Sequence, residues 1–318
     1  MDSGGKESAT PSPRGAEAPK VSVLVVTYNH ERFIRSALES ALSQSTDFPF
    51  EIVVGDDAST DRTRRIVESI AAEHPGTIVP LLHDHNLGGL GSRNFLTTIA
   101  RARGRYLAIL EGDDLYTDST KLQRQADFLD ANPDCAGCFH DCATIDEHDR
   151  PLQARFPLKL RVPRVTERDV VAGGNNAVTN TRMFRRECVE RFPSWYLAHT
   201  MDWGLEILVA GFGDWGFIDR TMSAYRVHGG GVFSNAGLVR QHELIMGMAE
   251  VLIAEPRFAP YRSALRDRLA WMSRDAAASA RKSGDGGAYR ANLFRFVRYA
   301  RKNRGFARWV ATEMLSWV

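Results

Sequence analysis

The sequence has no long apolar segment and few cysteines. No apolar run approaches the roughly 18 to 20 residues that a membrane-spanning helix needs, and residues 1–19 lack the apolar core of a signal peptide. Only 4 cysteines occur among 318 residues, which excludes a disulfide framework and favours a reducing compartment. No internal repeat is present. With 43% apolar and 25% charged residues, the composition is that of a globular protein with a sizeable core.

Charge and composition divide the chain into three regions. Residues 1–19 are rich in Ser, Gly, Pro and Ala, and we expect them to form a disordered tail. Residues 20–233 are expected to form one α/β domain, and residues 234–318 a basic helical region. Between residues 256 and 318 there are 14 Lys and Arg against 4 Asp and Glu, a net charge of +10. The overall charge is +2, so the preceding residues are acidic.

Short apolar runs alternate with amphipathic segments between residues 20 and 110. The runs predict four strands, at 21–26, 50–54, 77–82 and 105–110. Pro80 lies in the third run and predicts an edge strand, because proline cannot donate a ladder hydrogen bond. Helical patterns separate the runs, over 31–44, 62–73 and 92–101. This alternation predicts a mostly parallel, Rossmann-like sheet with helices on both faces and right-handed crossovers.

The pattern after residue 114 is less regular. Extended segments are predicted near 135–145 and 215–227. Helices are predicted near 120–130, 181–191, 203–211, 236–254, 260–282 and 288–317, the last with a break at Gly305.

Polar residues follow three of the four predicted strands. Thr27, Tyr28 and Asn29 follow the first, Asp56 and Asp57 the second, and Glu111, Asp113 and Asp114 the fourth. Ligands of such sheets bind outside the carboxyl ends of the strands, so a site is expected there. Adjacent carboxylates repel unless a cation or hydrogen-bond donors offset their charge, and Mg²⁺ or Mn²⁺ takes one or two carboxylates with phosphate oxygens. Taken alone, each cluster equally suits a solvated turn that caps a helix.

Several segments in this order together resemble the family 2 glycosyltransferases, which have the GT-A fold. The resemblance extends from residue 21 to residue 234, about two-thirds of the chain. The matching segments are VSVLVVTYNHERFIRSALESALSQ (21–44), VVGDDASTDRT (53–63), NLGGLGSRN (86–94), YLAILEGDDLY (106–116), TNTRMFRR (179–186), MDW (201–203) and AYRVHGGGVFS (224–234).

The resemblance implies a role for each matching residue. The residues implied for nucleotide-sugar binding are Thr27, Tyr28, Asn29, Asp56, Asp57, Arg93 and Asp113. Among them, Tyr28 and Asp57 would hold the base, Arg93 the base or diphosphate, and Asp113 the ribose or sugar.

The resemblance also implies a metal site and a catalytic base. Asp114 and His228 would bind the divalent metal, Mn²⁺ or Mg²⁺, and Asp202 would be the base. Two positions depart from the family pattern. Glu111 replaces the first Asp of the metal motif, and Met201 replaces the acidic residue that commonly precedes the base.

The implied activity is an inverting, metal-dependent glycosyltransferase. It would move a sugar from a nucleotide donor, with UDP expected first and dTDP second, to a hydroxyl of a glycan, glycolipid or metabolite by single displacement. A double displacement needs a protein nucleophile, and the sequence offers no obvious one. Two alternatives stay open. A nucleotidyltransferase would need a basic Gly-rich phosphate loop after the first strand, which Thr27–His30 does not supply, and a non-catalytic binding or scaffold protein could keep the same fold.

The basic C-terminal region has two interpretations. Residues 288–312 mix Arg and Lys with aromatic side chains, which suits either adsorption to an anionic membrane surface or packing on the acidic catalytic body. The expected location is therefore the cytoplasm, with peripheral contact at the inner face of the membrane as the further possibility. No nucleic-acid module accompanies the charge. Cys135, Cys138, His140 and Cys142 have partial zinc-site spacing, but a second distant pair is missing and buried strand cysteines are favoured.

Overall fold

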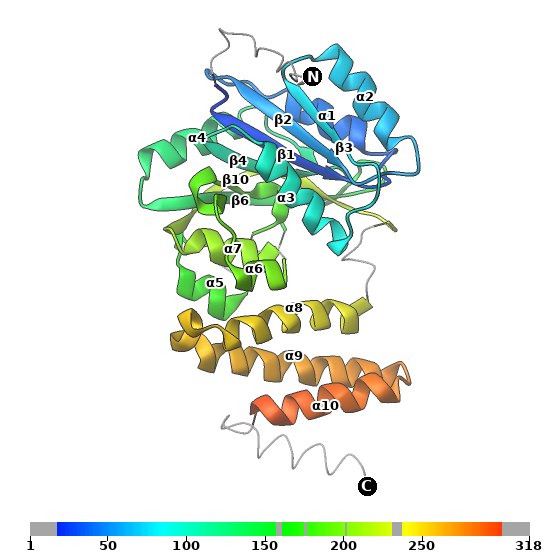
Figure 1. Ribbon diagram of the computed structural model, residues 1–318, viewed down its shortest axis with the longest axis vertical. Helices are drawn as coiled ribbons and strands as arrows, with labels where there is room; N and C mark the ends of the chain where they lie inside the picture. Colours follow the sequence, from blue (N-terminus) through cyan, green and yellow to red (C-terminus); the bar gives the residue numbers. More distant parts are fainter. Residues whose placement is uncertain (1–17, 157–160, 175–176, 201, 231–236, 301–318) are drawn as a thin grey trace, which may run out of the picture.

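The computed structural model describes residues 18–156, 161–174, 177–200, 202–230 and 237–300 (Figure 1). A ten-stranded mixed sheet forms the centre of the fold, with helices on both faces. The strands are β1 (Val21–Thr27), β2 (Phe50–Asp56), β3 (Ile78–Leu82), β4 (Tyr106–Glu111), β5 (Leu115–Tyr116), β6 (Cys135–Asp146), β7 (Pro151–Gln153), β8 (Arg164–Val165), β9 (Met183–Arg185) and β10 (Asp214–Val227).

The described residues contain ten α-helices, of which the first seven lie around the sheet. They are α1 (Ile34–Leu42), α2 (Thr63–Glu73), α3 (Ser92–Arg101), α4 (Lys121–Ala131), α5 (Glu167–Gly173), α6 (Ser194–Ala198), α7 (Asp202–Ala210), α8 (Gly237–Ala254), α9 (Arg262–Lys282) and α10 (Gly286–Ala300). Short 3₁₀ turns occupy Gly89–Gly91, Thr179–Thr181, Arg186–Val189 and Pro256–Tyr261.

The strand order confirms the predicted parallel half of the sheet. The order is β3-β2-β1-β4-β9-β6-β10-β5, and the first four strands pair in parallel. Strand β3, which contains Pro80, lies at the edge as predicted. The second half begins with β9, which pairs antiparallel with both β4 and β6, and β10 then runs parallel to β6.

The helix predicted near 181–191 is wrong. This segment forms a 3₁₀ turn, strand β9 and a second 3₁₀ turn. Phe184 lies opposite Leu107 of β4 and Gly137 of β6, so pairing with two neighbouring strands overrides the local helical preference. The other predicted helices up to residue 300 are present. The last predicted helix, 288–317, is described only to residue 300, and residues 1–17 of the predicted tail lie outside the described residues.

The alternation of side chains along β1 produces two apolar layers. Val21, Val23 and Val25 are fully buried with α1, α2 and α4 on one face of the sheet. Leu24 faces the opposite layer, which includes residues of α3, α5 and α7. Burying an aliphatic side chain of this size contributes about 1.5–3 kcal/mol, so these strands hold the sheet in one register.

The C-terminal helices stack in successive layers below the sheet (Figure 1). Helix α8 contacts α6, α9 contacts both α8 and α5, and α10 packs on α9. Met246 of α8 and Leu269 of α9 belong to the same buried cluster as Leu24 of β1 and Trp203 of α7. The apolar core therefore continues from the sheet into α8 and α9. Within the described ranges, no helix has the length and apolar content needed to cross a membrane.

Candidate functional site

The three predicted polar clusters meet at one edge of the sheet. The amide of Asp57 donates to the carbonyl of Thr27 at 3.0 Å, and the amide of Gly112 donates to the carbonyl of Val26 at 2.9 Å. These bonds tie the segments that follow β2 and β4 to the end of β1. The edge is the carboxyl end of the parallel strands, where ligands of such sheets bind.

Asn29 and Asp56 join the loops that follow β1 and β2. The amide of Asn29 donates to Oγ of Ser59 at 2.9 Å, and Oδ1 of Asn29 accepts from the amide of Thr60 at 2.8 Å. Asp56 is fully buried and accepts from both the amide and the hydroxyl of Ser59. Asn29 has a φ of 56°, a left-handed conformation that asparagine tolerates. These two side chains therefore shape the loops, and their expected contact with a nucleotide stays a prediction.

Asp57 organises the loop before α3. Its Oδ1 accepts from the amide of Leu87 at 2.7 Å, and its backbone carbonyl accepts from Nδ2 of Asn86 at 3.1 Å. Arg93, which is exposed, donates to the carbonyl of Leu87 at 3.1 Å. Tyr28, 43% exposed, lies in the adjoining loop after β1. Asp57 and Arg93 are thus brought to one rim of the sheet edge, and no described residue donates to Oδ2 of Asp57.

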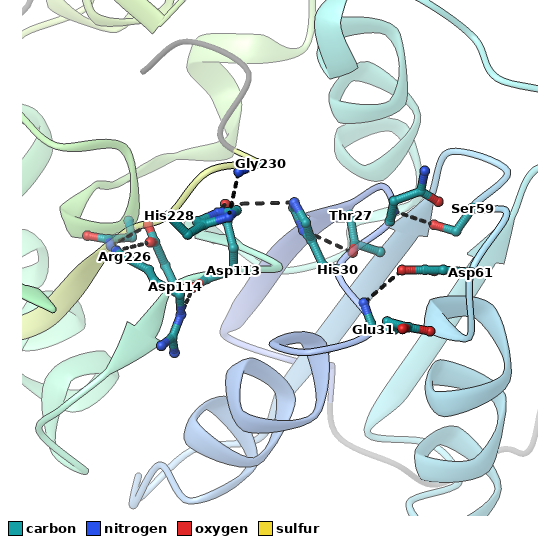
Figure 2. Close-up of polar contacts among 12 residues, drawn as sticks. Thr27, His30, Glu31, Ser59, Asp61, Asp113, Asp114, Arg226, His228 and Gly230 are labelled. Atoms are coloured by element: carbon teal, nitrogen blue, oxygen red, sulfur yellow. Dashed lines mark hydrogen bonds and ion pairs between the residues drawn. The ribbon is translucent and has the colours of Figure 1, made fainter. Parts of the chain in front are cut away.

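Asp113 is the centre of a histidine cluster (Figure 2). Nε2 of His228 lies 2.9 Å from Oδ2 of Asp113, and Nε2 of His30 lies 3.7 Å from the same oxygen. The amide of Gly230 donates to Nδ1 of His228, so Nε2 carries the proton that His228 donates to Asp113. Although burial acts in the opposite direction, the His228 hydrogen bond and the charge of His30 lower the pKa of Asp113. His30 has no role in the sequence-based prediction.

Asp114 is held inside the protein by two donors. It is 1% exposed, its Oδ1 accepts from the amide of Arg226 at 2.8 Å, and its Oδ2 accepts from Nδ2 of Asn180 at 2.7 Å. Burial and the neighbouring charge of Asp113 raise the pKa of Asp114 well above its usual range. The sequence predicts Asp114 and His228 as the metal pair, whereas in the structure His228 contacts Asp113.

Asp202 begins α7 and keeps a half-exposed carboxylate. Oγ1 of Thr179 donates to its Oδ2 at 2.8 Å, and Nη1 of Arg182 lies 3.6 Å from its Oδ1. Arg182 is fully buried, and its Nη2 lies 3.0 Å from Oε1 of Glu206. The side chain of Asp202 is 52% exposed, so one edge of the carboxylate faces outward. Thr179 and Arg182 belong to the segment 179–186, which resembles the family in sequence. The sequence analysis assigned no role to either residue.

Glu111 is the last residue of β4 and precedes the turn that contains Asp113 and Asp114. Burial, followed by the nearby carboxylates of Asp114, Asp202 and Asp113, raises the pKa of Glu111 well above its usual range. The same side chain is therefore within electrostatic reach of both Asp113 and Asp202. The turn at Thr179–Thr181 links the carboxylates of Asp202 and Asp114 directly, because Thr179 donates to Asp202 and the next residue, Asn180, donates to Asp114.

A divalent metal fits this edge only with help from a substrate. Among the described residues, no group of three or more His, Cys, Asp or Glu side chains is arranged to hold a metal ion. Asp113 offers a carboxylate and His228 an imidazole on the same side of the site. Mg²⁺ and related ions commonly use one or two carboxylates and complete their coordination with substrate phosphates and water.

Two solved structures share the fold. A mannosyltransferase, PcManGT, from Pyrobaculum calidifontis, in complex with GDP-Man and Mn²⁺, superposes with a TM-score of 0.58 at 22% identity, covering 95% of this chain and 85% of its own. TarS (1–349) of S. aureus, in complex with UDP-GlcNAc, superposes with a TM-score of 0.56 at 18% identity, covering 86% of this chain and 90% of its own.

Sequence relatives and a family model extend the comparison. Rv1520, an uncharacterized protein of Mycobacterium tuberculosis, is 36% identical over 217 residues, and the match spans 68% of this chain and 61% of the relative's length. Residues 22–192 match the model of glycosyl transferase family 2, and this match covers more than half of the chain. The chain therefore belongs to glycosyl transferase family 2.

Proposed function

We propose that this protein transfers a sugar from a nucleotide-sugar donor to a hydroxyl group, with inversion at the sugar carbon. The observation that carries the proposal is the half-exposed carboxylate of Asp202, which Thr179 and Arg182 hold at the same sheet edge as Asp113 and His228. A base and a diphosphate-binding group side by side are what a single displacement requires.

The donor nucleotide binds at the rim formed by Tyr28, Asp57 and Arg93. The carboxylate of Asp57 only accepts hydrogen bonds, so its Oδ2 suits the ring N–H of a uracil or thymine base. Arg93 is exposed beside it and suits the diphosphate. UDP is the first candidate and dTDP the second. The proposal of a nucleotide-sugar donor is further supported by the fold shared with proteins bound to UDP-GlcNAc and GDP-Man.

Asp113 and His228 would hold the divalent metal, Mn²⁺ or Mg²⁺, in this proposal, with the metal taking the place of the proton that Nε2 of His228 shares with Oδ2 of Asp113. Asp113 replaces Asp114 in that role, because both oxygens of Asp114 already accept hydrogen bonds inside the protein. A bound metal would supply charge neutralisation for the leaving diphosphate. Asp114 instead fixes the turn after β4 through Arg226 and Asn180, and so keeps Asp113 directed toward the histidines.

Asp202 removes the proton from the acceptor hydroxyl as that oxygen attacks the sugar. Glu206, the next carboxylate along α7, is 2% exposed and paired with Arg182, so it is not accessible to an acceptor hydroxyl. One exposed base opposite one leaving group produces inversion. A hydroxyl of a glycan, glycolipid or small metabolite suits this base equally, and we propose acceptors of that class.

Nucleotide binding and turnover, measured separately, test the proposal. Thermal shift and calorimetry with UDP, dTDP, GDP and CDP, each with Mn²⁺, Mg²⁺ or EDTA, should give a metal-dependent response to one nucleotide. Asp113→Asn should abolish the metal dependence, while the exposed control Asp127→Asn on α4 should not. Asp202→Asn should bind the nucleotide as the wild type does and fail to release it from the donor sugar.

Two results would contradict the proposal. No response to any nucleotide would remove the donor site. Binding of a nucleotide sugar by the wild type without turnover for any hydroxyl acceptor or water would instead support a non-catalytic binding protein.

A further inference from the structure

Among the described residues, helix α10 forms the last layer of the C-terminal stack (Figure 1). Its buried residues are Asn292, Phe296 and Ala300, which recur every fourth position. Phe296 and Ala300 form a small apolar cluster with Ala270 of α9. Residues four apart share one face of a helix, so the inner face of α10 is the one that packs on α9.

A polar contact with α8 fixes the rotation of α10. Glu250 of α8 accepts a hydrogen bond from the hydroxyl of Tyr299 at 3.2 Å and lies 3.3 Å from Nε of Arg295. Both donors flank the inner face. With the apolar cluster and this contact in place, Arg290, Phe294 and Arg298 are left exposed on the outside. These three residues, also four apart, are called the α10 outer stripe.

The α10 outer stripe combines an exposed aromatic ring with positive charge that no described carboxylate pairs with. Phe294 is 72% exposed, the highest value among the exposed large hydrophobic residues that the structure describes. Neither Arg290 nor Arg298 forms a salt bridge with a described residue. Helix α10 contains no acidic residue, and the sequence from 286 to 312 carries 7 Lys and Arg and no Asp or Glu.

We propose that the α10 outer stripe docks on an anionic lipid bilayer. Phe294 enters the headgroup layer, and Arg290 and Arg298 lie against lipid phosphates on either side of it. Exposed aromatic residues flanked by basic ones are typical of helices that lie in the membrane interface. Clusters of four to eight basic residues on an amphipathic helix bind anionic lipids, and each such residue near the surface contributes roughly fivefold in affinity.

The lipid surface fits better than the other anionic partners. The phosphates of a nucleic acid would pair with the two arginines. They would offer no apolar partner to the ring of Phe294 between them. A second copy of the chain would offer acidic residues, but the stripe is one helix wide and too small for a stable protein interface. The proposal concerns binding alone and does not depend on the proposed sugar transfer.

Vesicle binding by the full chain tests this inference. Flotation with phosphatidylcholine vesicles is compared with flotation on vesicles of equal parts phosphatidylcholine and phosphatidylglycerol, at low and high salt. The wild type should bind only the anionic vesicles and should be released by salt. Arg290→Glu with Arg298→Glu should weaken binding by roughly 30-fold or more, and Phe294→Ala by about 5-fold.

The matched control reverses the same charge elsewhere. Arg65 of α2 and Arg101 at the end of α3 are both exposed, and Arg65→Glu with Arg101→Glu changes the net charge equally. The control should bind as the wild type does, and the thermal midpoints of all variants should match. Equal loss of binding in the control and the α10 variant would overturn the proposal. Equal binding of the wild type to vesicles with and without phosphatidylglycerol would overturn it as well. Concentration-dependent self-association that Arg290→Glu with Arg298→Glu abolishes, without vesicle binding, would also overturn it.

Discussion

Thr179 donates its hydroxyl hydrogen to Oδ2 of Asp202 at 2.8 Å. The donor comes from the 3₁₀ turn before β9, and the acceptor is the first residue of α7. The carbonyl of Arg182, three residues after Thr179, accepts from the amide of Ile109 in β4, so the turn is itself fixed to the central sheet. The proposed base is therefore held by the sheet as well as by its own helix.

Replacing Thr179 by valine should slow turnover without weakening nucleotide binding. Valine keeps the shape and removes the hydroxyl, and a hydrogen bond to a charged group is worth about 1.5–3 kcal/mol, or roughly a 10- to 100-fold lower kcat. Thr179→Ser should restore most of the rate. The measurements are donor turnover and nucleotide affinity by calorimetry. An unchanged kcat in the valine variant would exclude Thr179 as a positioning residue for Asp202.

Removing Asn180 should destabilise the fold at the turn after β4. Asn180→Ala leaves Oδ2 of the buried Asp114 without its donor, and it also removes the bonds of Asn180 to the carbonyl of Ala224 and the hydroxyl of Ser223. The variant should therefore lose at least about 1–3 kcal/mol of unfolding free energy. Chemical denaturation provides the measurement. Ser43→Ala is the control, because the exposed Ser43 hydroxyl donates only to the carbonyl of Ser40 and its loss should cost less than about 1 kcal/mol. Equal losses of unfolding free energy in both variants would mean that the buried hydrogen bonds of Asn180, including the one to Asp114, stabilise the fold no more than an exposed one does.

The buried Lys121 should make stability rise with pH. Burial lowers its pKa from 10.5 to about 7, while its Nζ lies 2.7 Å from Oε1 of Gln125. Between these two pH values the unfolded chain binds a proton that the folded chain has lost. Unfolding free energy should therefore increase with pH in this window, by at most about 1.4 kcal/mol per pH unit from this group.

The variant Lys121→Met isolates that contribution. Denaturation curves are compared between pH 7 and 9. Burial raises the pKa of the neighbouring Cys138 from 9.0 to about 12, so above pH 9 this thiol makes the unfolding free energy fall as pH rises. His140, also buried nearby, has its pKa lowered well below 6.5 by burial and stays neutral in this window. The wild type should gain stability relative to the methionine variant as pH rises. Parallel curves would show that Lys121 titrates normally.

Loss of Arg268 should transmit a defect from α9 to the proposed base, Asp202. Nη1 of Arg268 donates to the carbonyl of Gly173 at 2.7 Å, and its guanidinium lies 4.9 Å from the ring centroid of Trp203, the neighbour of Asp202. Arg268→Ala should lower kcat by roughly 10-fold with nucleotide affinity unchanged. Arg266→Ala, an exposed neighbour on the same helix, is the control. A fall in kcat of the same size in both variants would exclude a specific bracing role.

The sequence predicted the parallel half of the fold because its strands are buried on both faces. Val21 to Val26 is a continuous apolar run, and its strand character is visible without any partner. Strand β9 could not be found in this way, because three residues from Met183 to Arg185 are too few to display alternation. Its existence depends on β4 and β6, which are distant in the sequence.

The shared position of the polar clusters was predictable from the sequence, and their contacts were less so. Polar residues after buried strands indicated that the clusters would share one sheet edge, as they do in the structure. Asp113 and Asp114 are adjacent, however, and the turn after β4 decides which of them meets His228. The same limit applies to His30, whose imidazole reaches Asp113 only because of the way the chain turns after β1.

The continuous core between the sheet and the last helices has a consequence for synthesis. The apolar faces of α5, α6 and α7 receive cover from α8 and α9, which leave the ribosome last among these elements. Until α9 emerges, the nascent chain presents an uncovered apolar surface, and domains with such surfaces tend to aggregate or recruit chaperones. The α/β half of this protein is therefore expected to complete its folding late, after the helices that follow it in the sequence.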